Sequence, residues 1–257
     1  MIVASVMKQA SRFRWIGNLV LLGGLLLGLS WSGAMAQGTL TPASSEGPAQ
    51  RVYAPPQAPA PAMLVISGQG GMTDDYQAYA RKLAALGYFT VLVDGNDILP
   101  KGAGGFDSLK KAMARAQQSP QVVKGKTGVV SFSLGGGAGL AWAANLPDQV
   151  SMVIAYYPFT SFDTAKDANA FVKRFRVPVL TLAAERDNYK NCCLIETIRA
   201  IETVAKQSGA NFELVVYSRA NHGFNLNGGS TYRHEDDQDS WKRTQDFLRR
   251  YHPSKVG

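Results

Sequence analysis

The stretch TGVVSFSLGGGAGL, from Thr127 to Leu140, contributes most to the fold prediction. An apolar, β-rich run ends at Phe132, a single hydroxyl follows at Ser133, and three glycines then open a run of small residues. This order predicts a buried strand, a sharp turn and a helix. A serine at such a turn is how many hydrolases expose a nucleophile, usually within the pattern G-x-S-x-G. The chain keeps the second glycine of that pattern but not the first.

The departure lies at Ser131, which replaces the first glycine, whereas Gly135 retains the second. The turn strains the serine backbone and brings strand and helix close together, so the residues two before and two after it must be small. Serine has one of the smallest side chains and meets this steric requirement. The alternative interpretation is a structural glycine-rich helix start that binds a phosphate.

From Ala62 onward, short β-rich runs alternate with helical patterns. Strands are predicted at 63–67, 88–94, 128–132, 150–158, 177–184 and 212–218. Helices are predicted between them, including 107–116, 164–174 and 194–207, with a last helix around Trp241 to Tyr251. Continuous apolar strands joined by helices indicate a parallel sheet covered on both faces. We therefore expect an α/β fold with a mostly parallel sheet of about six to seven strands.

Three polar residues follow three of these strands, in the order Ser133, Asp187, His222. The working loops of such sheets lie at the carboxyl ends of the strands, and this order of serine, acid and histidine is that of α/β-hydrolases. A serine hydroxyl needs a neighbouring base to become a nucleophile. His222 would take its proton, while Asp187 would fix the imidazole tautomer and stabilise the imidazolium. The pattern predicts acyl transfer without a cofactor.

Each of these residues also has a structural interpretation. Asp187 is alternatively a surface carboxylate or a helix cap, and Glu185 competes with it as the acid. His222 is alternatively a surface histidine. The other two histidines fit less well, because His234 lies in the acidic run RHEDDQD and His252 lies near the end of the chain. The acidic run lacks the spacing of a metal-binding loop, so we expect no metal.

The chain from about Ala62 to Tyr251 resembles the dienelactone hydrolase family of α/β-hydrolases. The matching stretches include MLVISGQGGMTDDYQAYARKLAALGYFTVLVD, SFSLGGG as the nucleophile turn, AAERD as the acid loop and ANHGF as the histidine loop. The resemblance implies the α/β-hydrolase fold and these site residues: Ser133 as nucleophile, Asp187 as acid, His222 as base, and the backbone N–H groups of Gln69 and Leu134 as oxyanion donors.

Several positions depart from the family. The best-known members carry a cysteine nucleophile and a glutamate in the first loop, where this chain has Ser133 and Gly68. Ala184 stands where a glycine is common in the acid loop, and the opening hairpin is expected to be shortened to little more than QRVYA. These differences favour ordinary ester chemistry over a dienelactone substrate.

Charged and aromatic residues surround the predicted site. Arg186, Lys190 and Arg219 lie on the two loops that carry the acid and the base, so they are candidates for attracting a carboxylate-bearing substrate. The alternative is ordinary solvated charge. Aromatic residues near strand ends are candidates for an apolar wall, with the core as the alternative: Tyr156, Tyr157, Phe159 and Phe224.

The first 36 residues have the composition of an export signal. They contain three cations and no acid, followed by an apolar run from Trp15 to Leu29 and an A-M-A site before Gln37. The alternative is an uncleaved membrane anchor, for which the apolar run is short. We expect residues 1–36 to be a signal peptide and residues 37–61, rich in Pro, Ala and Ser, to be a linker. Residues 62–257 then form the hydrolase domain of a periplasmic or secreted protein that has no membrane segment after signal removal.

The length of 257 residues fits one sizeable core. The formal charge is +8, and about +5 remains after the leader because 24 cations then face 19 acids. No Lys/Arg-dense helix or interleaved aromatic patch is present, so nucleic acid is not an expected partner.

Cys192 and Cys193 are adjacent and are the only cysteines of the chain. They cannot join two distant elements. In an oxidising compartment they stay free, bridge to another chain or close on each other in a strained ring. A further interpretation is two small buried hydrophobic residues at a helix start.

These observations favour an exported serine hydrolase that cleaves a small ester or lactone through an acyl-serine intermediate. The alternative from another class is a catalytically silent ligand-binding module on the same fold.

Overall fold

The computed structural model describes residues 38–99, 104–161 and 167–255. The predicted signal peptide, residues 1–36, lies outside the described residues. Within the described part of the chain, none of the helices is both long enough and apolar enough to cross a membrane.

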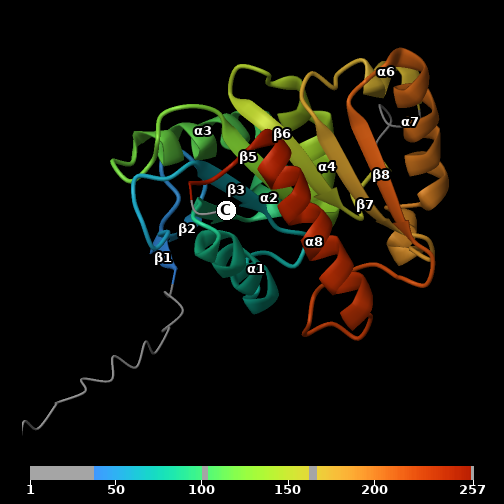
Figure 1. Cartoon of the computed structure of the whole chain (residues 1–257), viewed down its shortest axis with the longest axis horizontal. Helices are drawn as coiled ribbons and strands as arrows, with labels where there is room; N and C mark the ends of the chain where they lie inside the picture. The colour runs from blue at the N-terminus through green and yellow to red at the C-terminus, as the bar shows by residue number, and fades with distance from the viewer. Residues whose placement is uncertain (1–37, 100–103, 162–166, 256–257) are drawn as a thin grey trace, which may run out of the picture. The chain divides into compact units, whose positions relative to one another are not determined.

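An eight-stranded sheet forms the centre of the fold, in the order β1-β2-β4-β3-β5-β6-β7-β8 (Figure 1). Its strands are β1 (Thr39–Thr41), β2 (Gln50–Tyr53), β3 (Ala62–Ile66), β4 (Phe89–Val93), β5 (Thr127–Phe132), β6 (Val150–Tyr156), β7 (Val179–Ala184) and β8 (Phe212–Tyr217). Strands β3 to β8 are mutually parallel, whereas β1 and β2 pair antiparallel. The predicted α/β fold with a mostly parallel sheet is confirmed.

The sheet is wider than predicted because the expected linker contains two strands. β2 pairs antiparallel with β4, with Gln50 opposite Val93, and β1 extends the sheet by one more strand. The intervening loop is also held, since Arg115 donates to the carbonyl oxygen of Pro48 at 3.1 Å and Lys111 donates to that of Ser45 at 2.9 Å. Pro, Ala and Ser content predicted a linker, but ladder hydrogen bonds use the backbone, which composition does not report.

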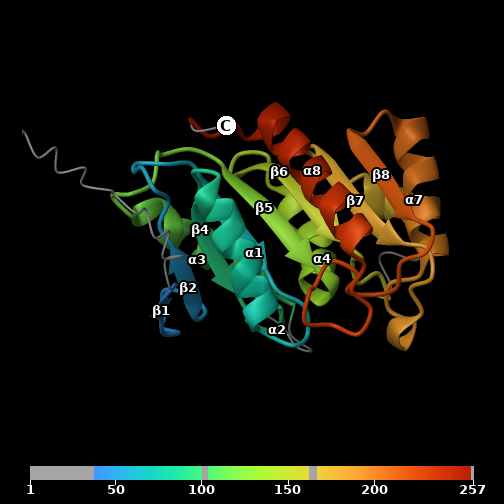
Figure 2. The same ribbon diagram turned by 60° about the horizontal axis from the view of Figure 1, so that its bottom comes forward.

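Helices cover both faces of the sheet. One face carries α1 (Asp74–Ala85) and α8 (His234–Tyr251), which lie in front of the sheet in Figure 2. The other face carries α3 (Gly105–Gln118), α4 (Ser133–Ala141), α6 (Ala168–Val172) and α7 (Ile195–Ser208). The shorter helices are α2 (Gly95–Ile98), η1 (Ala143–Asn145) and η2 (Tyr189–Asn191).

Two apolar cores result, one on each side of the sheet. Along β3, Met63 and Val65 belong to the core under α1 and α8, whereas Leu64 and Ile66 belong to the opposite core. Successive side chains of a strand point to opposite faces. A strand buried on both faces therefore reads as the continuous apolar run seen in the sequence.

Phe132, the last residue of β5, anchors the end of the central strand. Its ring is fully buried and lies 4.9 Å from the ring of Tyr79 and 4.8 Å from that of Tyr156. Burying a phenylalanine contributes about 1.5–3 kcal/mol. This packing fixes the backbone immediately before Ser133.

Candidate active site

Ser133 is the first residue of α4 and follows β5 directly, in a left-handed conformation with φ of +50°. Such a conformation costs a residue other than glycine about 1–2 kcal/mol. Hydrogen bonds on both sides hold it: Phe159 N donates to Ser133 O at 2.7 Å, and Gly135 N donates to Ser67 O at 3.2 Å. The strained turn predicted from the sequence is therefore present.

The small residues around this turn are required by close contacts. A Cβ atom on Gly135 would lie 2.5 Å from the carbonyl oxygen of Ser67. Ser131 fits because the residue facing it is Gly139, where a Cβ would approach the Ser131 Oγ to 2.3 Å. The Ser131 hydroxyl donates to the Ile154 carbonyl at 3.1 Å. Gly139 compensates for the missing first glycine, a relation that the sequence analysis did not identify.

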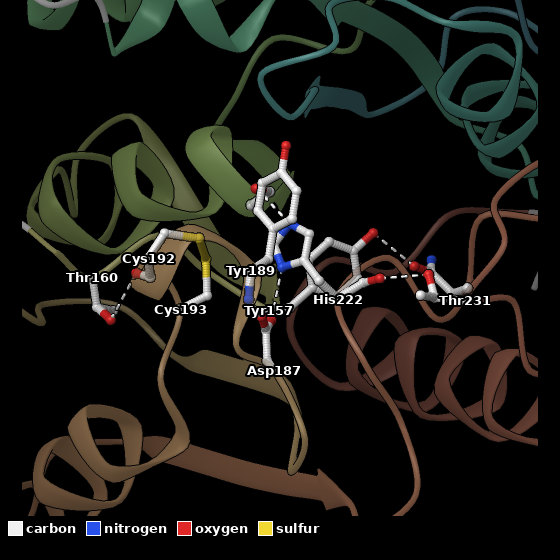
Figure 3. Close-up of polar contacts among 10 residues, drawn as sticks. Tyr157, Thr160, Asp187, Tyr189, Cys192, Cys193, His222 and Thr231 are labelled. Atoms are coloured by element: carbon white, nitrogen blue, oxygen red, sulfur yellow. Dashed lines mark hydrogen bonds and ion pairs between the residues drawn. A yellow bond between two sulfur atoms is a disulfide. The ribbon is translucent and has the colours of Figure 1, made fainter.

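Ser133, His222 and Asp187 form one continuous hydrogen-bonded chain. His222 Nε2 lies 2.9 Å from Ser133 Oγ, and His222 Nδ1 lies 2.7 Å from Asp187 Oδ2. The Asp187 side chain is fully buried and accepts from Nδ1–H, so the Nε2 lone pair faces the serine hydroxyl. Figure 3 shows Asp187 reaching the imidazole ring.

The acid loop after β7 separates the two candidate carboxylates. Asp187 Oδ1 accepts from the backbone N–H of Tyr189 at 3.1 Å, so both of its oxygens have partners. Glu185 instead pairs with Arg199 of α7 at 2.6 Å. The geometry therefore brings Asp187, and not Glu185, to the histidine.

Two aromatic rings and a hydroxyl hold His222. The Tyr189 ring stacks on the imidazole (Figure 3), and the ring centroids lie 4.6 Å apart with an interplanar angle of 11°. The Tyr157 ring meets it edge-on at 4.7 Å, and Thr231 Oγ1 donates to the His222 carbonyl at 2.6 Å. The sequence analysis did not assign Tyr189 a role, and its only signal is its place two residues after Asp187.

A cavity of about 440 Å³ opens beside Ser133. Its lining comprises Gln69, Asn96, Leu99, Ser133, Leu134, Phe159, Tyr189, Lys190 and Cys192. Both predicted oxyanion residues, Gln69 and Leu134, thus share the cavity with the predicted nucleophile.

The first loop is fixed by neighbours that the sequence analysis missed. Asn96 of α2 donates through Nδ2 to the Gln69 carbonyl at 3.0 Å, and Lys190 Nζ donates to Gln69 Oε1 at 3.4 Å. Helix α2 also places Leu99, its C-cap residue, in the lining. No motif marked α2, because it has only four residues and follows β4 directly.

Gly68 stands where the best-known family members carry a glutamate, and a side chain there would require Tyr76 to move. A Cβ at Gly68 would lie 2.6 Å from the Tyr76 hydroxyl and 3.2 Å from the Ser133 Cβ. Burial raises the pKa of Tyr76 to about 12, so this hydroxyl stays protonated at neutral pH. Tyr76 occupies the space beneath the nucleophile turn.

The four predicted substrate-binding residues do not line the cavity. Arg186 and Arg219 are exposed at the surface, consistent with solvated charge, and Lys190 is the cation that the loop directs to the cavity. Tyr157 and Phe224 are buried in the core, where their rings lie 5.6 Å apart. A residue's place in a loop did not reveal the direction of its side chain.

Cys192 and Cys193 are joined to each other in a vicinal disulfide with an S–S distance of 2.11 Å. Of the alternatives left open by the sequence, the structure shows the closed pair. In the described part of the chain, these two residues and His222 form the one grouping of three potential metal ligands, and the disulfide occupies both sulfurs.

Comparison with known proteins assigns this chain to a family. The sequence model of the dienelactone hydrolase family matches residues 96–252. A protein of Methylorubrum extorquens named "Putative carboxymethylenebutenolidase" is 27% identical over 236 residues, which span 79% of this chain and 77% of that protein.

Solved structures show the same fold. The crystal structure of a "Putative Dienelactone Hydrolase" from Klebsiella pneumoniae matches with a TM-score of 0.71 and 19% identity, over 83% of this chain and 98% of that one. The dienelactone hydrolase-like promiscuous phosphotriesterase P91 from metagenomic libraries matches with a TM-score of 0.66 and 16% identity, over 84% and 99%. The chain therefore belongs to the dienelactone hydrolase family of α/β-hydrolases, whose activity is the hydrolysis of esters and lactones.

Proposed function

We propose that the chain is an exported serine hydrolase that cleaves a small ester or lactone through an acyl-serine intermediate at Ser133. The observation that supports this most is the hydrogen-bonded chain of 2.9 Å from Ser133 to His222 and 2.7 Å from His222 to Asp187, which opens into the cavity. A nucleophile in reach of a base, with the base oriented by a third group, is the arrangement that acyl transfer requires.

In the proposed reaction, Ser133 Oγ attacks the carbonyl carbon of the ester while its proton passes to His222 Nε2. Asp187 stabilises the imidazolium that forms. The negative oxygen of the tetrahedral intermediate accepts from the backbone N–H groups of Gln69 and Leu134, and each such donor contributes about 3 kcal/mol. The leaving alcohol takes the proton from His222. Water then attacks the acyl-serine by the same route and releases the acid.

The cavity favours a small substrate with an apolar part. Its volume of about 440 Å³ lies in the lower half of the usual range for ligand sites. Leu99, Leu134 and Phe159 supply apolar surface, and Lys190 supplies a positive charge on one side. A lactone is accommodated by the same reaction, because its leaving alcohol stays attached to the acyl group.

A short-chain aryl ester and an organophosphonate ester test the reaction. The folded chain should hydrolyse the aryl ester, and mass spectrometry should place one phosphonyl group on Ser133. Ser133→Ala should lose both the turnover and the label, whereas Ser131→Gly, which restores the usual first glycine of the turn, should keep both. An aryl ester that binds without turnover, and a phosphonate that leaves no label, would favour a silent binding module instead.

Export is the second part of the proposal, and residues 1–36 support it by their composition. The vicinal disulfide adds support, since disulfides persist in oxidising compartments. Mass spectrometry of the protein from the periplasm or medium should find Gln37 at the amino terminus. Ala36→Leu should block cleavage and shift the protein to the membrane fraction. Wild-type protein recovered from that fraction with an intact leader would indicate an anchor.

A further inference from the structure

The disulfide lies beside the histidine that the proposed reaction uses as its base. The Sγ atoms of Cys192 and Cys193 and a ring nitrogen of His222 all lie within 4.8 Å of one another. Cys192 is part of the cavity lining, and both cysteines are otherwise buried, with 8% and 3% of their surface exposed. Figure 3 shows the sulfur pair to one side of His222 and Tyr189.

Hydrogen bonds hold Cys192 and its neighbour Asn191 in this place independently of the S–S bond. The Cys192 carbonyl accepts from Thr160 N at 2.8 Å, and Cys192 N donates to the Tyr189 carbonyl at 3.0 Å. Ser161 Oγ donates to the neighbouring Asn191 carbonyl at 2.6 Å. Because these contacts involve no sulfur, they persist when the disulfide opens and keep Cys192 near His222. Cys193 stays close because it is the next residue of the chain.

We infer that reduction of the Cys192–Cys193 disulfide creates a binding site for a thiophilic divalent cation, Zn²⁺ or Cd²⁺, with the two sulfurs and a His222 ring nitrogen as ligands. Two electrons from a dithiol or a phosphine break the S–S bond, and each sulfur gains a proton. A dithiol becomes a disulfide, whereas a phosphine takes an oxygen atom from water. The cation then displaces the two thiol protons and receives a lone pair from neutral imidazole.

The distances allow this coordination with small movements. A tetrahedral zinc with bonds of about 2.3 Å to sulfur and about 2.0 Å to nitrogen places its ligand atoms roughly 3.5–3.8 Å apart. The two sulfurs separate when their bond is broken, and each already lies within 4.8 Å of the imidazole nitrogen. Thiolates select soft cations such as these.

The cation would block the proposed reaction, and this consequence rests on the proposed function. Both ring nitrogens of His222 are engaged, one with Asp187 and the other with Ser133. A metal on either nitrogen replaces one of these hydrogen bonds, so the imidazole no longer takes the serine proton. The disulfide prevents this competition, since its sulfurs carry no thiolate. The oxidised pair thereby protects the base from metal.

Cadmium titration of the full chain tests the site without reference to activity. After phosphine reduction and removal of the reductant under anaerobic conditions, Cd²⁺ should bind at one ion per chain and produce the ultraviolet absorption of cadmium–thiolate bonds. The unreduced chain should show neither. Aryl ester hydrolysis measured in parallel should fall with the bound fraction and recover when a chelator removes the ion.

Variants test the cysteine ligands and the histidine ligand one at a time. The double change Cys192→Ser and Cys193→Ser should abolish stoichiometric binding and leave the rate, whatever its starting value, unaffected by Cd²⁺. His222→Gln should keep thiolate absorption but weaken the affinity by at least about tenfold, whereas His234→Gln, at an exposed histidine, should not change the affinity. Equal affinity in wild type and His222→Gln, or no stoichiometric binding after reduction, would overturn the inference.

The inferred metal site and the proposed hydrolase activity can be refuted independently of each other. Cadmium binding to a reduced chain that never hydrolyses esters would support the metal site and refute the hydrolase. Hydrolysis that persists in the reduced, cadmium-loaded chain would leave the hydrolase in place and overturn the inference that the metal blocks the base.

Discussion

Two histidines lie at opposite ends of the strands of the sheet, and each uses both ring nitrogens in hydrogen bonds. His222 lies at the carboxyl ends of the strands and bonds Asp187 and Ser133 through its two ring nitrogens. His252 lies at the amino ends and also uses both nitrogens, Nε2 toward the Ala62 carbonyl at 2.9 Å and Nδ1 toward Ser151 at 2.9 Å. A tyrosine ring stacks on each one.

The partners of the two rings differ in charge. His222 faces a carboxylate, which compensates an imidazolium, and its other nitrogen meets a hydroxyl in an open cavity. His252 faces a hydroxyl and a carbonyl, and burial lowers its pKa to about 4, so it stays neutral at pH 7. The number of hydrogen bonds does not distinguish a base from a structural histidine. A buried carboxylate partner and an open side toward the cavity distinguish His222 from His252.

The largest expected effect comes from breaking the chain of proton transfer. Ser133→Ala and His222→Ala should each lower kcat for an aryl ester by a factor on the order of 10⁶, because the two residues act as one unit. His252→Gln should leave kcat almost unchanged at pH 7.5 in protein that is shown to be folded by circular dichroism. A kcat in His252→Gln as low as in His222→Ala would reverse the assignment of the two histidines.

The next effect tests the carboxylate that distinguishes the two rings. Asp187→Asn should lower kcat by about 10⁴, because an amide neither fixes the tautomer nor stabilises the imidazolium. Glu185→Gln is the matched control at the neighbouring acid, which pairs with Arg199, and it should change kcat less than about threefold, as expected of a change at an exposed ion pair. A larger loss in Glu185→Gln than in Asp187→Asn would show that the wrong acid had been assigned.

Sequence reasoning anticipated features that depend on local sterics or on strand order. The turn at Ser133 needs small neighbours, and Ser131 and Gly135 show this in the sequence itself. The carboxyl ends of parallel strands meet at one edge, so residues after β5, β7 and β8 were expected to converge. The sequence assigned Asp187 as the acid with Glu185 as its competitor, and only the conformation of the loop separates the two.

The features that sequence reasoning missed depend on side-chain direction and long-range pairing. Arg186 and Lys190 lie on the same loop, yet only Lys190 reaches the cavity. Asn96 comes from a four-residue helix without a motif. The strands β1 and β2 lie in a stretch whose composition predicted a linker, because backbone pairing with β4 leaves no mark on composition.

A moderate effect on stability should arise at the other histidine. The pKa of His252 is about 4 in the folded chain and about 6.5 when unfolded. Below pH 6.5, His252 binds a proton in the unfolded chain but not in the folded chain. The free energy of unfolding therefore falls as the pH drops toward 4. The total loss from this residue is about 3 kcal/mol.

Urea unfolding between pH 7.5 and 4.5 measures this loss. His252→Gln should be less stable than wild type at pH 7.5 but should lose less stability on acidification. His234→Gln is the matched control, because it removes an exposed histidine at the start of α8 and leaves His252 in place. Parallel pH curves for wild type and His252→Gln would mean that His252 takes up its proton equally in both states.

The smallest effect concerns the stacked tyrosines. Tyr189 lies over His222 with ring centroids 4.6 Å apart, and Tyr88 lies over His252 at 5.6 Å. An aromatic contact is worth about 0.5–1.5 kcal/mol, so losing the ring that orients His222 should lower kcat up to about tenfold. Tyr189→Leu should show this loss, whereas Tyr189→Phe should keep the wild-type kcat, because stacking needs the ring and not the hydroxyl. Tyr88→Leu should lower the free energy of unfolding and leave kcat unchanged. If Tyr189→Phe is as slow as Tyr189→Leu, the phenol hydroxyl at the cavity wall, rather than stacking, supports the reaction.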